Sequence, residues 1–186
     1  MSLISLIDDR FTDKNTIHFY IDTYEKLFQN KKNEYVNILE IGILEGGSIK
    51  LWRDYFVNGK IHAVDINLTH LKSDILNDKQ ITIYGKHNAY EHNFINAHLS
   101  DIKFDYLIDD GPHSLESMIF FIQNYTKLLT DDGVLVIEDV QDFSWIEKLK
   151  DATPEDLKSY IKVVDVRNVK NRYDDLMFII DKGGYL

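Results

Sequence analysis

Seven apolar segments alternate with helical patterns along the chain, and this alternation constrains the fold more than any other feature. Several segments are apolar without a break, as expected of strands that are buried on both faces. Alternating strands and helices favour a parallel sheet with helices on both faces. The predicted strands are Asn37–Gly42, Lys60–Ile66, Ile81–Gly85, Phe104–Asp110, Gly133–Asp139, Tyr160–Arg167 and Leu176–Asp181.

Helical periodicity is clearest from Ser114 to Leu129, where apolar residues recur at three- and four-residue steps. The predicted helices are Thr16–Gln29, Ser48–Phe56, Thr69–Asn77, Tyr90–Leu99, Ser114–Leu129 and Trp145–Ser159, the last interrupted before Pro154. The short polar connection Asn168–Asp175 leaves no room for a helix, so the last two strands should form an antiparallel hairpin. An α/β fold of seven strands with the last one antiparallel resembles the Rossmann-like sheet of class I methyltransferases.

The length of 186 residues predicts a single domain, and 44% hydrophobic residues can fill its core. The chain has no cysteine, which excludes disulfides, thiolate metal sites and cysteine nucleophiles. Its longest apolar runs are far shorter than the roughly 20 residues of a membrane span. The first residues lack the basic start of a signal peptide, so we expect a cytoplasmic protein.

The net charge of −10 speaks against a role on DNA or RNA, because phosphate contacts need clustered Lys and Arg. An acidic surface that keeps the chain soluble is one interpretation. A second interpretation is that some of the carboxylates converge on a cation. The composition is consistent with both interpretations.

Two glycines stand where the first predicted strand ends: Gly42 is its last residue and Gly46 follows it. Glu40 precedes this pair and Ser48 comes after it. Glycine lets the backbone turn tightly and approach a ligand, and the next helix begins with free amides. Leu44 stands where a dinucleotide fingerprint needs its second glycine, which disfavours NAD or FAD. The spacing resembles the loop that binds S-adenosylmethionine in methyltransferases. An ordinary strand–turn–helix is the alternative.

Asp65 ends the second predicted strand, 23 residues after Gly42. A carboxylate at that place can accept both ribose hydroxyls of a nucleoside. Asn88 follows the third strand, where related enzymes often have an acid that reaches adenine, and its amide oxygen can accept the same hydrogen bond.

Two pairs of acids end neighbouring strands of the predicted sheet: Asp109 with Asp110, and Glu138 with Asp139. The carboxyl ends of parallel strands meet at one edge, which is where open α/β sheets bind ligands. Four crowded carboxylates repel one another unless they are protonated or bridged by a cation. Oxygen ligands favour Mg²⁺, with Mn²⁺ or Ca²⁺ as alternatives. The alternative is that these acids only cap strand ends.

His113 lies three residues after Asp110 and just before Ser114, the predicted N-cap of a helix. The helix N-terminus disfavours a protonated imidazole, whereas nearby carboxylates favour it. This balance suits a general base, and we predict that role for His113.

Three blocks of sequence carry a resemblance to a known family. They are Thr12-Asp13-Lys14 with His18, Tyr20 and Tyr24; Glu40 to Ser48 with Leu51-Trp52; and Asp109-Asp110-Gly111-Pro112-His113 with Glu138-Asp139. Here the chain resembles the metal-dependent sugar O-methyltransferases of the mycinamicin and macrocin type, a family that includes proteins called cephalosporin hydroxylases. Pro112 stands where a serine is common.

The resemblance implies a role for each matching residue. Asp110, Glu138 and Asp139 would hold the cation, and His113 would take the proton from a sugar hydroxyl. His18, Tyr20 and Tyr24 would bind the substrate from an N-terminal segment, residues 1–35, that acts as a lid. The residues expected around S-adenosylmethionine are Glu40, Gly42, Gly46, Ser48, Asp65, Asn88 and Asp109.

These features together predict an O-methyltransferase that uses S-adenosylmethionine and a divalent metal and acts on a hydroxyl of a sugar or glycosylated small molecule. Two alternatives stay open: a methyltransferase of another small-molecule class, and a non-catalytic relative that binds the cofactor. A dioxygenase would need a second histidine in the acid cluster, where only His113 is expected. We expect a saccharide or small-molecule partner and no nucleic acid, and leave open a homo-oligomer.

Overall fold

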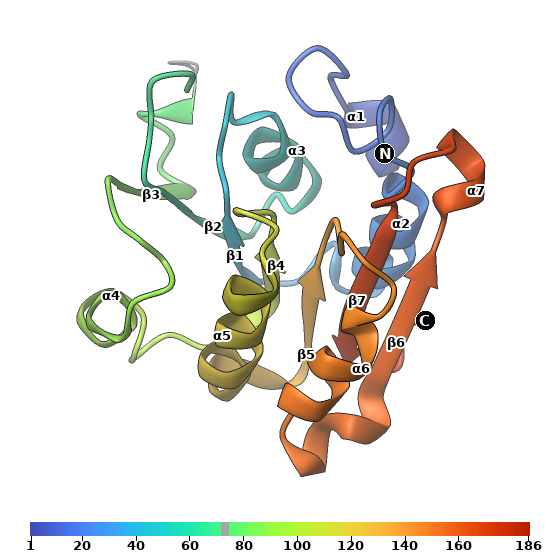
Figure 1. The fold of residues 1–186 in the computed structure, drawn as a ribbon. Coiled ribbons are helices and arrows are strands. Elements are labelled where there is room, and N and C mark those ends of the chain that lie inside the picture. Colours follow the sequence, from blue (N-terminus) through green and yellow to red (C-terminus); the bar gives the residue numbers. More distant parts are fainter. Residues whose placement is uncertain (72–74) are drawn as a thin grey trace.

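The protein is described here by a computed structural model, which covers residues 1–71 and 75–186. Seven strands form one sheet in the order β3-β2-β1-β4-β5-β7-β6 (Figure 1). β1 to β5 are parallel, and β7 runs antiparallel to both of its neighbours. The predicted seven-stranded sheet with its reversed last strand is confirmed. The strands are β1 Asn37–Ile41, β2 Lys60–Asp65, β3 Ile81–Gly85, β4 Phe104–Asp109, β5 Leu129–Ile137, β6 Ile161–Asp165 and β7 Leu176–Asp181.

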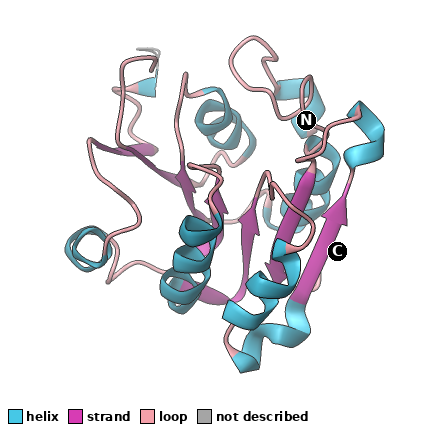
Figure 2. Ribbon diagram, in the orientation of Figure 1, coloured by secondary structure: helices cyan, strands magenta, loops and turns pink. Residues whose placement is uncertain are grey.

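Helices cover both faces of the sheet, as predicted (Figure 2). One core contains side chains of α1, α2 and α3, and the other contains side chains of α4, α5 and α6. Successive strand residues alternate between the two cores: Ile38 belongs to the first and Leu39 to the second. The helices are α1 Leu3–Leu6, α2 Ile21–Phe28, α3 Gly47–Tyr55, α4 His92–His98, α5 Leu115–Tyr125, α6 Trp145–Ala152 and α7 Arg167–Lys170.

Local sequence signals explain where two helices begin or end. The Ser114 side chain accepts a hydrogen bond from the Ser117 amide, which makes it the N-cap of α5, as predicted. α6 ends at Ala152 before Pro154, and a 3₁₀ segment, η4 Glu155–Tyr160, follows. Further 3₁₀ turns, η1 Gln29–Lys31 and η3 Thr126–Leu128, extend α2 and α5.

Three predicted boundaries need correction, and a fourth predicted element is only partly described. α7 lies in the connection for which no helix was expected, because the Asp165 side chain accepts a hydrogen bond from the Arg167 amide and starts a single turn. β5 begins at Leu129, ahead of the predicted Gly133, and its register with β4 shifts there. α2 begins at Ile21, later than the predicted Thr16. The helix predicted over Thr69–Asn77 includes residues 72–74, which lie outside the described residues, and the described remainder contains no α-helix.

The carboxyl ends of β1, β4 and β5 lie side by side, which places the two acid pairs at one edge. Ile41 is in register with Asp109, and Asp109 with Ile137. Backbone pairing continues past the strands: the Asp110 amide donates to Ile41 over 2.9 Å, and the Glu138 amide donates to Asp109 over 3.0 Å. Of the helices in the described chain, none has the length and apolar character to cross a membrane.

Candidate active site

A cavity of about 860 Å³ opens at this edge of the sheet. Its wall consists of the N-terminal segment and the loops that follow the parallel strands β1 to β5. Seven predicted site residues line it: Gly42, Ser48, Asp65, Asn88, Asp110, His113 and Asp139. Seven others are not among its described lining residues: Glu40, Gly46, Asp109, Glu138, His18, Tyr20 and Tyr24. Half of the predicted site residues therefore line the cavity, and the other half are not among its described lining residues.

Gly42 and Gly46 are required by the shape of the turn after β1. Gly42 has a φ of +97°, and a Cβ there would lie 2.0 Å from the Asp110 carbonyl oxygen. Gly46 has a φ of +88°, and a Cβ would lie 2.5 Å from the Ile75 side chain. Both residues thus let the turn pack closely against its neighbours. Only Gly42 also faces the cavity.

Glu40 is fully buried on the face covered by α3. It accepts hydrogen bonds from the Ser48 hydroxyl, over 2.7 Å, and from the Trp52 indole N–H. Burial raises the pKa of Glu40 to about 7, although the nearby Lys14 ammonium acts in the opposite direction. The Glu40 carboxylate thus anchors α3 beneath the glycine turn and is not among the described lining residues of the cavity, and its contact with the cofactor stays a prediction.

Asp65 holds the glycine turn and also lines the cavity. Its Oδ2 accepts from the Ile43 amide over 2.8 Å, and its Oδ1 accepts from the Asn67 amide over 2.8 Å. A carboxylate oxygen can accept more than one hydrogen bond, so this arrangement leaves capacity for a ligand hydroxyl. Asn88 lines the cavity at the next loop, where its Oδ1 accepts from the Tyr90 amide over 3.0 Å.

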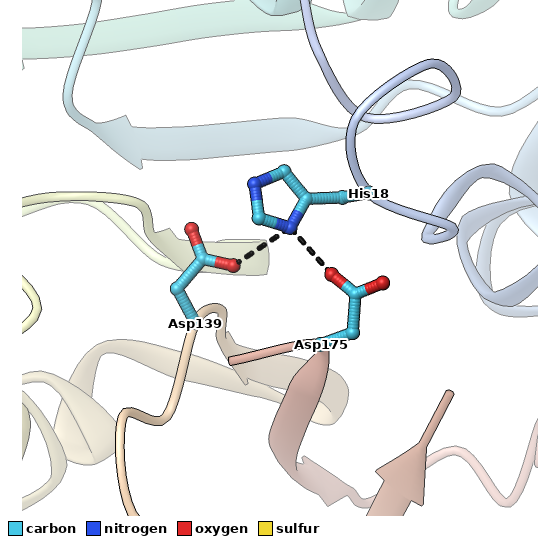
Figure 3. Close-up of side chains that lie close together, drawn as sticks. All are labelled: His18, Asp139 and Asp175. Carbon is cyan, nitrogen blue, oxygen red and sulfur yellow. Dashed lines mark hydrogen bonds and ion pairs between the residues drawn. The ribbon is translucent and has the colours of Figure 1, made fainter. Parts of the chain in front are cut away.

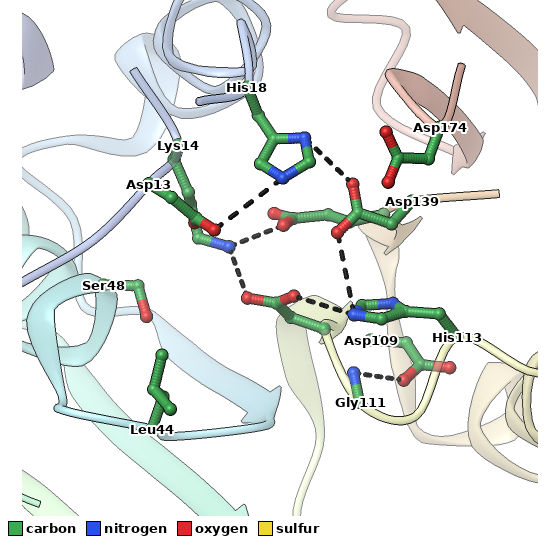
Figure 4. Close-up of polar contacts among 12 residues, drawn as sticks. Asp13, Lys14, His18, Leu44, Ser48, Asp109, Gly111, His113, Asp139 and Asp174 are labelled. Atoms are coloured by element: carbon green, nitrogen blue, oxygen red, sulfur yellow. Dashed lines mark hydrogen bonds and ion pairs between the residues drawn. The ribbon is translucent and has the colours of Figure 1, made fainter. Parts of the chain in front are cut away.

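A buried lysine, Lys14, lies within the acid cluster (Figure 4). Its Nζ is 2.8 Å from Asp110 Oδ2, 2.6 Å from Glu138 Oε2 and 3.7 Å from Glu40 Oε1. Burial alone would lower the pKa of Lys14, but the three carboxylates raise it well above its ordinary value, so the ammonium stays charged. Burial raises the pKa of Glu138, whose other oxygen accepts from the Tyr24 hydroxyl.

Asp139 is held by side chains of the N-terminal segment, and Figure 3 shows its contact with His18. Its Oδ1 accepts from the Tyr20 hydroxyl over 2.6 Å and lies 3.2 Å from His18 Nδ1. His18 Nδ1 is also 2.6 Å from Asp175 Oδ1. Burial raises the pKa of Asp139, while the Tyr20 hydrogen bond opposes the increase. His18, Tyr20 and Tyr24 are buried and hold carboxylates in place in this structure, and their predicted contact with the substrate stays a prediction.

His113 faces the free oxygens of the two cavity-lining acids. Its Nε2 lies 3.7 Å from Asp139 Oδ2 and 3.9 Å from Asp110 Oδ1. His113 and Asp139 both have a φ of +53°, in the left-handed region that residues with a side chain rarely adopt. Such backbone strain is concentrated at functional sites in proteins. The imidazole is therefore held where it can exchange a proton with a group in the cavity.

Asp109 was expected near the cofactor and the cation, and that role stays a prediction. It is buried, and its Oδ1 accepts from the Tyr90 hydroxyl and, over 3.3 Å, from the Gly111 amide. Burial raises the pKa of Asp109 to about 6. Gly111 is fitted against this contact, since a Cβ there would lie 2.2 Å from the Tyr90 hydroxyl. Asp109 thus fixes the turn that carries His113.

The described residues offer two groups of donor atoms that one cation could bridge. The first, His18 with Asp139 and Asp175, is already explained by the 2.6 Å hydrogen bond between His18 and Asp175. The second, Asp110 with His113 and Asp139, lines the cavity and has no hydrogen bond among its members. Two carboxylate oxygens that face the same cavity suit a hard divalent cation. Glu138, the third predicted ligand, would share its oxygens with Lys14 and Tyr24.

Sequence reasoning gave no role to Lys14, Tyr90 or Asp175, although all three hold site residues. Lys14 lies within one of the quoted sequence blocks, but the side-chain hydrogen-bond partners of Lys14 and Asp175 are more than 90 residues away along the chain. The residues around Lys14 form no local pattern that predicts these contacts. Only the packing of the N-terminal segment against the strand ends reveals its partners.

No family model matches the chain. Two curated relatives are similar to it. The mycinamicin VI 2″-O-methyltransferase of Micromonospora griseorubida is 29% identical over 144 residues, which cover 73% of this chain and 35% of the relative. The demethylmacrocin O-methyltransferase of Streptomyces fradiae is 28% identical over 142 residues, 70% of this chain and 34% of the relative. The predicted resemblance is confirmed, and the chain spans about a third of these relatives' length.

A solved structure shares the fold over the whole chain. The MycE methyltransferase from the mycinamycin biosynthetic pathway, in complex with Mg and SAH, has a TM-score of 0.76 at 21% sequence identity. The match covers 100% of this chain and 55% of the MycE chain. The Rossmann-like methyltransferase fold is therefore confirmed for this chain.

Proposed function

We propose that the chain is an S-adenosylmethionine-dependent O-methyltransferase that acts, with a divalent cation, on a hydroxyl of a sugar or glycosylated small molecule. One observation carries the proposal: a single cavity joins the glycine turn and Asp65 to His113, Asp110 and Asp139. A methyl donor held by the glycine turn and Asp65 would lie in the same cavity as His113 and the free carboxylate oxygens of Asp110 and Asp139. The similarity to sugar O-methyltransferases supports the same conclusion.

When bound, S-adenosylmethionine would supply the sulfonium methyl group, and a divalent cation would make a nearby hydroxyl more acidic. On the chain, the turn from Gly42 to Ser48 and the Asp65 carboxylate would hold the methyl donor. Asp110 and Asp139, supported by Glu138, would hold the cation. The protein's main contribution is then to align the acceptor oxygen with the methyl carbon.

His113 is the proposed general base. Its Nε2 faces the cavity region between Asp110 and Asp139 and would accept the hydroxyl proton as the oxygen–carbon bond forms and the methyl–sulfur bond breaks, so that the sulfur would leave as a neutral thioether. The two carboxylates stabilise the imidazolium that results. The contact of Asp109 with Tyr90 and with the Gly111 amide holds the turn that carries His113 in its strained conformation and so keeps the ring in this place.

Calorimetry with S-adenosylhomocysteine (SAH), in Mg²⁺ and separately in EDTA, tests whether the cavity binds the cofactor. We expect one SAH per chain, and binding at least about tenfold weaker in Asp65→Asn, which loses the anionic acceptor for ribose hydroxyls but keeps an oxygen for the turn. Asp101→Asn is the matched control, since Asp101 is exposed and precedes β4. An absence of SAH binding at millimolar concentration would overturn the proposal.

A further inference from the structure

Lys14 is a second cation built into the proposed divalent-cation site. Its side chain is 1% exposed, and its ammonium contacts Asp110 Oδ2 and Glu138 Oε2 at hydrogen-bond distance. These acids are two of the three predicted metal ligands. A buried ammonium is costly to desolvate and is retained when its protons are paired with carboxylates. The pairing therefore removes two acceptor oxygens from those available to a metal.

The segment around Lys14 holds the ammonium in this place. The Tyr20 amide donates to the Lys14 carbonyl over 3.0 Å, and the His18 amide donates to the Asp13 carbonyl over 2.9 Å. These bonds close a loop directly before α2, which is why the helix does not begin at Thr16. Lys14 Nζ also lies 6.0 Å from the centre of the buried Tyr24 ring. The ammonium is thus fixed by backbone and by packing.

The contacts divide the oxygens of Asp110 between two directions. Oδ2 is bound by Lys14, and Oδ1 faces His113 at 3.9 Å. Asp139 shows the same division, because Tyr20 binds Oδ1 and Oδ2 faces His113 at 3.7 Å. In each acid the N-terminal segment holds one oxygen and leaves the other toward the cavity. The base and the cation would meet only these two free oxygens.

We infer that Lys14 is a positioning residue and an internal counter-ion that competes with the divalent cation for Asp110 and Glu138, and so keeps cation binding weak. The inference rests on the cation in the proposed function. Two positive ions that share the same carboxylates repel each other, and each lowers the negative potential that attracts the other. Without the ammonium, Asp110, Glu138 and Glu40 would present uncompensated charge to a metal.

The test is Mn²⁺ binding measured by electron paramagnetic resonance, which needs no acceptor and no turnover. Mn²⁺ suits the same oxygen ligands as Mg²⁺. We expect Lys14→Met to bind Mn²⁺ at least about tenfold more tightly than the wild type, because a nearby positive charge is removed. A purely structural role for Lys14 would instead leave the affinity unchanged or weaken it.

Lys31→Met is a matched control. Lys31 is also buried and is bound by two acids, Asp105 at 2.8 Å and Asp132 at 2.7 Å. Asp105 lies at the start of β4, at the other end of the strand from the cavity. This variant should lose stability as Lys14→Met does, but its affinity for Mn²⁺ should equal that of the wild type.

Lys14→Arg keeps the inference testable if Lys14→Met does not fold. Arginine retains the positive charge, so we expect wild-type affinity for Mn²⁺, and a tenfold increase in this variant would overturn the inference. Equal or weaker Mn²⁺ binding by folded Lys14→Met would also overturn it while leaving the proposed function intact. Failure of every variant to bind Mn²⁺ would overturn both the inference and the proposed cation.

Discussion

At the scale of single residues, the site combines strained backbone with carboxylates that are held from behind. His113 and Asp139 each have a φ of +53°, a conformation that costs about 1–3 kcal/mol per residue when nothing compensates it. Tyr20 binds Asp139, and Asp109, bound by Tyr90, fixes the turn before His113. These contacts explain how the strain persists and why both side chains face one point in the cavity.

His62 provides a pH test of the fold that is independent of the site. It is buried on β2 with Nδ1 3.1 Å from the Tyr84 hydroxyl, and burial lowers its pKa to about 4. The unfolded chain therefore binds more protons between about pH 4 and 6.5, so the stability contributed by neutral His62 is lost as the pH falls through this window. Relative to His62→Gln, the wild type should lose roughly 2–3 kcal/mol between about pH 7.5 and 4.5.

Urea unfolding at both pH values measures this difference. His92→Gln is the matched control, because His92 is exposed on α4 and its replacement should leave the pH dependence of the wild type unchanged. Parallel stability curves for the wild type and His62→Gln would show that His62 is not held neutral by burial.

The residues whose position follows from the ends of the strands were predictable from the sequence, and the contacts that follow from packing were not. Asp110, Asp139 and His113 were found because strand ends and helix starts have local signals. The partners of Glu138 were not found, because Lys14 and Tyr24 reach it from 124 and 114 residues away. Glu40 was assigned to the cofactor, but its orientation toward Trp52 depends on which face of the sheet α3 covers.

At the scale of elements, the turn after β1 packs closely against the backbone of the loop after β4. Gly42→Ala should lower the free energy of unfolding by roughly 3 kcal/mol or more, because it adds a clash with the Asp110 carbonyl to a left-handed backbone. Gly184→Ala is the matched control: Gly184 has a φ of +68° and nothing within 4 Å, so we expect a loss of about 1 kcal/mol. Urea unfolding compares the two, and equal losses would contradict the close approach at Gly42.

The strands were predicted more accurately than the helices. β3 and β7 match their predicted bounds, since apolar runs with clear flanks define buried strands. The start of α2 was wrong because residues 13–20 fold into a loop that brings Lys14 and His18 to the acids. At α2 and at α7, local hydrogen bonds set the start of the helix, which periodicity alone does not predict.

At the scale of the whole molecule, the two faces of the sheet contribute different residues to the cavity edge. Glu40 and Glu138 meet side chains of α3 and α2, so the buried charges lie on that face together with Lys14. The turn that carries His113 leads into α5, whose side chains belong to the core on the other face. The site therefore forms where the N-terminal segment meets the carboxyl ends of β4 and β5.

Transfer of a labelled methyl group tests the central claim most directly. Glycoside extracts from a host that lacks this chain would be incubated with S-adenosylmethionine carrying a ¹³C methyl group, Mg²⁺ and either the wild type or His113→Ala, and analysed by mass spectrometry. We predict one labelled methyl group on a sugar hydroxyl with the wild type, and at least about a hundredfold less with His113→Ala, which should still bind SAH. Equal labelling by both proteins, or labelling by neither when both bind SAH, would contradict the account.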